Sequence, residues 1–66
     1  MCRNIKQLRF SDRSPTEEEL DLAALQFVRK VTGYRKPSRA NEEAFEAAVL
    51  EISSVTQRLF DDLVIR

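Results

Sequence analysis

Two stretches of the chain place apolar residues three and four positions apart, which is the spacing of one face of an α-helix. In the first stretch, the positions that share one arc of a helical wheel are Leu20, Ala23, Ala24, Phe27, Val28 and Val31. In the second stretch, they are Phe45, Ala48, Val49, Ile52, Val55, Leu59 and Leu63. The pattern therefore predicts an all-α protein with two amphipathic helices, over residues 17–32 and 41–63.

The ends of both predicted helices carry residues that favour helix starts and stops. Thr16 followed by Glu19 is a capping box, in which each side chain bonds the other residue's backbone N–H. Gly33 is suited to the left-handed conformation that ends the first helix. Asn41 is the predicted N-cap of the second helix, with Ser38 as an alternative one turn earlier. Because the loop between the helices has only about eight residues, we expect the second helix to return antiparallel to the first.

The residues before the first helix form a short basic segment, residues 1–14. Its apolar residues, Ile5, Leu8 and Phe10, follow neither the period of a strand nor that of a helix. We therefore predict an extended or irregular arm. The whole chain, residues 1–66, is then a single domain: a two-helix hairpin with an N-terminal arm.

Three leucines lie outside the two predicted apolar faces: Leu22, Leu25 and Leu50. Two helices share a single seam, and a chain of about 60 residues buries only about 60% of the surface that its unfolded form exposes. These leucines therefore need a further cover, from the arm or from a partner chain. We expect two hairpins to pair into a four-helix homodimer, with the three leucines at the contact.

The composition is that of a folded domain. Hydrophobic residues make up 42% of the chain, and 11 basic side chains balance 11 acidic ones, whereas disordered chains are usually less apolar or more highly charged. No apolar run approaches the roughly 20 residues of a membrane span, and the first residues contain no hydrophobic signal segment. We expect no membrane association and a cytoplasmic location, which a single cysteine also fits.

Three stretches of the sequence resemble one family. They are MCRNIK at residues 1–6, AALQFVRKVTG at residues 23–33, and KPSRAN at residues 36–41 with Ala44 and Phe45 after it. Together they resemble a bacterial family of short uncharacterised proteins, domain of unknown function 2277, along nearly the whole chain. The resemblance implies a helical protein of bacterial origin, and it implies no activity, substrate or catalytic residue.

A basic cluster links the two predicted helices. Positions 29 to 39 hold five basic residues and no acidic one: Arg29, Lys30, Arg35, Lys36 and Arg39. With Tyr34 available to stack on a base, this cluster indicates weak nucleic-acid or anion binding. The alternative is that cations simply favour the end of a helix and a solvated loop. The balanced net charge argues against a dedicated nucleic-acid binder.

Catalytic candidates are few. Cys2 is the only strong nucleophile, and Arg3 and Lys6 nearby would favour its thiolate form, which suggests a thiol-dependent redox role. The alternative is a small buried apolar side chain. Since the chain has no histidine, it lacks both the usual base for a thiol catalyst and the ligands of a His- or Cys-based zinc site. We expect no cofactor, no metal and no enzymatic activity, and our leading hypothesis is a self-associating interaction module.

Overall fold

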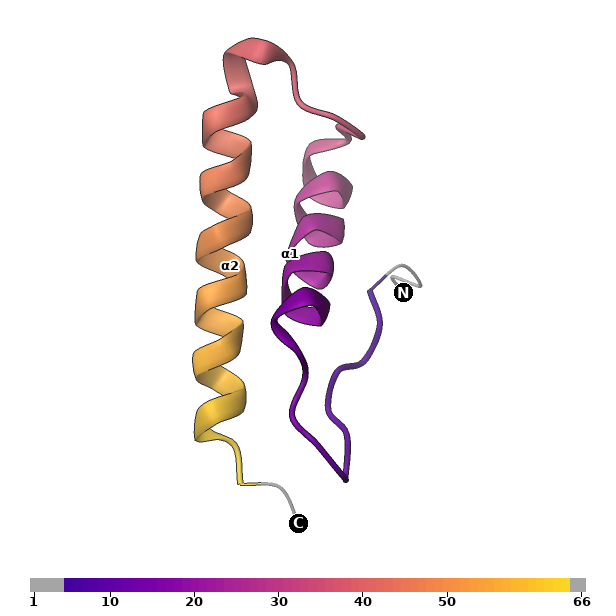
Figure 1. Ribbon diagram of the computed structural model, residues 1–66. Helices are drawn as coiled ribbons and strands as arrows, with labels where there is room; N and C mark the ends of the chain where they lie inside the picture. The colour runs from indigo at the N-terminus through magenta and orange to yellow at the C-terminus, as the bar shows by residue number, and fades with distance from the viewer. Residues whose placement is uncertain (1–4, 65–66) are drawn as a thin grey trace.

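A computed structural model describes residues 5–64, and within that range the protein contains helices and no strand (Figure 1). Helix α1 spans Glu17–Thr32, a short 3-10 turn, η1, spans Arg39–Asn41, and helix α2 spans Glu42–Asp62. The two α-helices run in opposite directions, side by side (Figure 1). The predicted all-α hairpin is therefore confirmed.

Both ends of α1 are fixed by the residues that the sequence pattern predicts. The Glu19 N–H donates to the Thr16 hydroxyl oxygen at 3.1 Å, and the Thr16 N–H donates to the Glu19 carboxylate at 2.8 Å. Gly33 has φ of 76°, and its N–H donates to the Arg29 carbonyl at 2.9 Å. The capping box and the left-handed stop are both confirmed, so local sequence alone sets the length of this helix.

The start of α2 differs from the prediction. Asn41 occupies the N-cap position, but its side chain makes no capping hydrogen bond. Its Nδ2 instead donates to the Ser38 hydroxyl oxygen at 2.9 Å, and its backbone N–H donates to the Ser38 carbonyl at 3.0 Å. The predicted N-cap position at Asn41 is therefore confirmed, but its side chain does not cap α2, because the 3-10 turn engages that side chain before α2 begins.

The core is small and comes from three segments. Leu20, Ala24 and Val28 of α1 are buried together with Phe45 of α2 and Leu8 of the arm. Leu20 is the most deeply buried, with 1% of its surface exposed. The seam also holds one polar contact, because the buried Ser53 hydroxyl donates to the Asp21 carboxylate at 2.5 Å.

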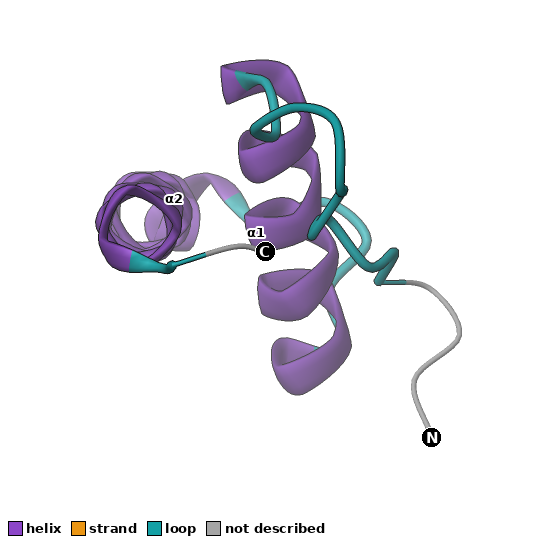
Figure 2. Ribbon diagram, turned by 90° about the horizontal axis from the view of Figure 1, so that it is seen from below, coloured by secondary structure: helices purple, strands orange, loops and turns teal. Residues whose placement is uncertain are grey.

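The apolar faces are only partly buried. The predicted face residues that stay exposed are Phe27, Val31, Val55, Leu59 and Leu63. When α2 is viewed nearly along its axis, α1 runs across the view, so the helices cross at an incline (Figure 2). Inclined helices contact each other over a limited length, which leaves the outer parts of each face uncovered. The buried side of α2 accordingly shifts toward Ser53, where the hydrogen bond to Asp21 makes a polar residue tolerable.

The described part of the arm, residues 5–14, is irregular, as predicted, and it lies along α1 (Figures 1 and 2). Leu8 anchors it in the core. The Arg13 guanidinium pairs with the Glu19 carboxylate at 2.8 Å and lies 4.1 Å from the centre of the Phe10 ring. The hydrogen bond from Arg13, helped by the Thr16 N–H, lowers the pKa of Glu19 to about 2. Glu19, which takes part in the capping box of α1, therefore also holds the arm against the helix.

The arm covers one flank of α1. Ile5 and Leu8 share a hollow with Ala23 and Phe27 of α1, and α2 lines its other side with Ile52, Thr56 and Phe60. The arm therefore does not provide the cover that Leu22 and Leu25 on the other flank require. Neither α-helix of the described chain is long and apolar enough to cross a membrane.

Candidate functional site

An open groove of about 990 Å³ lies between α1, the first half of α2 and the loop that joins them. Its lining includes all three of the leucines that the sequence pattern leaves off the core faces: Leu22, Leu25 and Leu50. Leu22 and Leu25 are three residues apart, so they share one flank of α1. The antiparallel return of α2 brings Leu50 to the same groove, which gathers the predicted self-association residues into one surface.

The groove is apolar and accessible. The side chains of Leu22 and Leu50 are 53% and 68% exposed, and Leu25 is half-buried. Phe45 and Val49 line the groove from α2 and connect these leucines to the core. Both helices therefore contribute to one continuous apolar surface that residues 5–64 leave open.

Charged residues stand at the two ends of this groove. Glu18 and Asp21 line it where α1 begins. Three cations, Arg29, Arg35 and Lys36, line it where α1 ends and the loop follows. Glu42 and Glu46 of α2 also line the groove, and they offset only part of the charge at the loop end. The groove is thus acidic at one end and carries a basic excess at the other.

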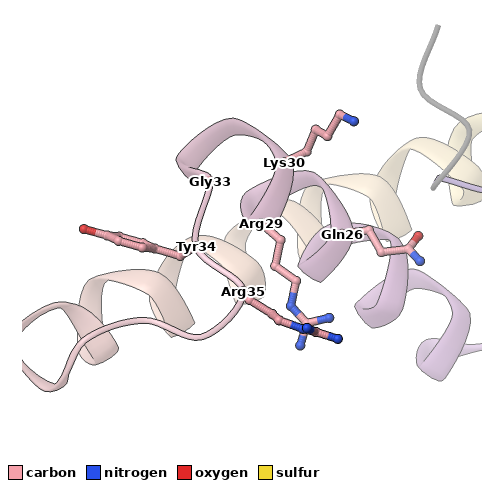
Figure 3. Close-up of a pocket in the computed structure, with 6 residues that line it drawn as sticks. All are labelled: Gln26, Arg29, Lys30, Gly33, Tyr34 and Arg35. Atoms are coloured by element: carbon pink, nitrogen blue, oxygen red, sulfur yellow. The ribbon is translucent and has the colours of Figure 1, made fainter.

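A second, smaller pocket of about 360 Å³ lies at the end of α1 (Figure 3). It is lined by Gln26, Arg29, Lys30, Gly33, Tyr34 and Arg35. The left-handed Gly33 turns the chain directly after the helix, and Arg35 then points toward the side chain of Arg29 (Figure 3). Lys30 and Tyr34 extend away from these two guanidinium groups (Figure 3).

The predicted basic cluster is therefore divided. Arg29 and Arg35 face one another and line both hollows, whereas Lys36 lines only the groove. Arg39 lies in the 3-10 turn and lines neither hollow. Tyr34 is 42% exposed and points away from the paired guanidinium groups, so a base stacked on it would not lie over them (Figure 3).

The described residues offer binding groups and few reactive ones. Among residues 5–64, no group of three His, Cys, Asp or Glu side chains lies close enough to hold a metal ion. Cys2, the candidate nucleophile, lies outside the described residues. The two hollows present apolar surface, guanidinium groups and, in the groove, carboxylates, and these groups suit non-covalent recognition.

Sequence reasoning missed part of both hollows. Gln26 lines the basic pocket, and Pro37 closes the loop side of the groove. Gln26 lies three residues before Arg29, so its place on the same helix flank is a signal that the spacing does carry. The position of Pro37 depends on the path of the loop, for which the sequence has no comparable periodicity.

The sequence matches one known protein family along its whole length. The family described as an uncharacterised conserved protein, DUF2277, matches residues 1–66. The chain belongs to this family. The resemblance drawn from its three sequence stretches is thereby confirmed. No curated protein and no solved structure matches the chain, so arguments about the function of this DUF2277 protein rest on its own residues.

Proposed function

We propose that this DUF2277 protein is a non-enzymatic interaction module that associates with a second copy of itself through the groove of Leu22, Leu25 and Leu50. The observation that supports it most strongly is that both helices contribute exposed leucines to one groove. Contiguous exposed apolar surface of this kind marks contact sites more often than single exposed side chains do.

The small core supports the same proposal. Five hydrophobic side chains of the described chain are buried, while Leu22, Leu50 and several others stay at least 40% exposed. A domain of this size gains little stability from its own core. Covering the groove would remove further apolar surface from water, at about 25 cal/mol for each Å².

The charges at the ends of the groove favour a second copy over an unrelated apolar partner. In a two-fold symmetric dimer, each contact between two residues occurs twice, with the roles of the copies exchanged. If the two grooves meet in antiparallel orientation, Glu18 and Asp21 of one copy face Arg29 and Arg35 of the other. Such pairing would fix the relative orientation of the two hairpins, because like charges would meet in the parallel arrangement.

Sedimentation of the full chain at micromolar concentrations tests this proposal. We expect a dimer for the wild type and a monomer for Leu50→Glu, because the new carboxylate would be buried without a partner. Leu59→Glu is the matched control, since Leu59 is also an exposed leucine of α2, at 54%, but does not line the groove. We expect this control to remain a dimer, and circular dichroism of both variants to retain the wild-type helix content.

Two results would contradict the proposal. The first is a wild-type chain that sediments as a stable monomer at these micromolar concentrations. The second is a dimer that Leu59→Glu disrupts as strongly as Leu50→Glu, since the contact would then lie elsewhere on α2.

We further propose that the homodimer works in the bacterial cytoplasm. The single cysteine supports this location, because one thiol cannot form a disulfide within the chain and such chains suit reducing compartments. Fractionation of bacteria that express the full chain with a C-terminal epitope tag should recover it with cytosolic markers. Recovery with periplasmic or membrane markers would contradict the location and leave the groove proposal unaffected.

A further inference from the structure

Arg29 and Arg35 form an unusual pair, because two cations point toward one another. Arg29 comes from the last turn of α1, and Arg35 follows the left-handed turn at Gly33 (Figure 3). The negative end of the helix dipole accounts for Arg29 and Lys30 within the helix. The helix dipole does not account for Arg35, which lies beyond the helix. The turn at Gly33 brings Arg35 back to the pocket that Arg29 lines.

Within residues 5–64, no carboxylate lies within ion-pair distance of Arg29 or Arg35, although Glu42 and Glu46 line the groove beside them. Among the same described residues, one ion pair brings a basic nitrogen within 4 Å of a carboxylate oxygen, that of Arg13 with Glu19. It lies at the start of α1, whereas the pocket lies at the end of that helix. The pocket itself is lined by no acidic residue. Two guanidinium groups that line one pocket repel each other, and an anion bound in that pocket converts the repulsion into two attractive contacts.

We propose that Arg29 and Arg35 bind a compact oxyanion of the phosphate class. Guanidinium groups present fixed forks of N–H donors that match phosphate oxygens, often two bonds at a time. The pocket, of about 360 Å³, is large enough for a phosphate group and a small part of the molecule that carries it. Since Tyr34 points away from the pair, the site recognises the anion and not a nucleobase.

Titration of the full chain with inorganic phosphate tests this site, with chloride at equal ionic strength as the reference. We expect saturable shifts of the Arg29 and Arg35 side-chain Nε–H signals in NMR spectra. Arg29→Gln and Arg35→Gln should each weaken phosphate binding roughly tenfold or more, because each removes one of two charged donors. Arg39→Gln is the matched control: it removes one charge from the same basic stretch without touching the pocket, and we expect unchanged binding.

A second arm of the experiment separates a phosphate-bearing small molecule from a nucleic acid. If a single-stranded oligonucleotide binds more tightly than phosphate and Arg39→Gln weakens it as much as Arg35→Gln does, the basic stretch acts as a whole and the proposed site is wrong. Shifts that chloride reproduces would also overturn it. The arginine pair is complete within one chain, so the monomeric variant Leu50→Glu should still bind phosphate. Because Glu18 and Asp21 of the second copy would face the same arginines in the proposed dimer, we expect this variant to bind at least as tightly as the wild type. Loss of phosphate binding in Leu50→Glu would contradict the proposed site and leave the groove proposal unaffected.

Discussion

The two flanks of α1 contrast sharply. On one flank, the protein covers its own helix, because the arm lies along it and Leu8 is only 7% exposed. On the other flank, Leu22 is 53% exposed, and Leu25 lines an open groove beside it. Both flanks carry apolar side chains, so their composition does not explain the difference.

The difference between the flanks follows from the direction that the chain takes before α1 begins. The Arg13–Glu19 ion pair and the capping box hold the residues before α1 against the arm flank. The described arm residues, 5–14, cover that flank and do not line the groove on the other. The groove flank is therefore where a second molecule can bury apolar surface without displacing part of the protein's own fold.

The sharpest test of this contrast compares a leucine from each flank. We expect Leu8→Ala to lower the free energy of unfolding by about 2 kcal/mol, because it removes a buried side chain and leaves a cavity. Leu22→Ala should change it by less than about 0.5 kcal/mol in dilute solution, because Leu22 is largely exposed and alanine favours a helix. Urea unfolding followed by circular dichroism measures both values. Equal losses in the two variants would mean that the arm is not part of the core.

A smaller effect is expected at the seam beside the groove. Ser53→Ala removes the hydroxyl that donates to Asp21. We expect a loss of about 1 kcal/mol in unfolding free energy, because the exposed Asp21 carboxylate can return to water and is not left unsatisfied. Ser54→Ala is the control on the exposed neighbouring position and should have almost no effect. If both variants behaved alike, the Ser53–Asp21 bond would contribute nothing to the helix pairing.

The smallest effect concerns the attachment of the arm as a function of pH. Glu19 has its pKa lowered from 4.5 to about 2, first of all by the hydrogen bond from Arg13. A lowered pKa in the folded state means that the carboxylate stabilises the fold fully above pH 4.5 and progressively less as the pH falls toward about 2. NMR signals of Phe10 and Arg13 should report this loosening of the arm within that range.

Two variants separate Glu19 from the other carboxylates that titrate at low pH. In Glu19→Gln, the arm signals should lose their titration step near pH 2, because the charged partner of Arg13 is absent. Glu17→Gln lies in the same first turn of α1 without pairing to Arg13, and it should retain the step. A step that survives in Glu19→Gln would show that another group fastens the arm.

Local sequence predicted much of the fold. The capping box and Gly33 set both ends of α1 through contacts within a few residues, and the 3.6-residue period identified both helices. The same reasoning placed Leu22, Leu25 and Leu50 off the core faces, and the structure brings these three into one groove. It placed the N-cap of α2 correctly at Asn41 but not the hydrogen bond of that side chain, because the sequence alone does not decide whether the side chain bonds the helix or the 3-10 turn.

The sequence by itself therefore determined where α1 begins and ends and which helix positions are apolar, since short-range hydrogen bonds and residue spacing fix these features. Only the tertiary structure decided which apolar positions are buried. The inclined crossing of the helices exposes Val55 and Leu59, while it buries Ser53 opposite Asp21. It also decided that the arm covers one flank of α1 and that Arg35 returns to Arg29, because contacts between distant residues depend on chain direction in space.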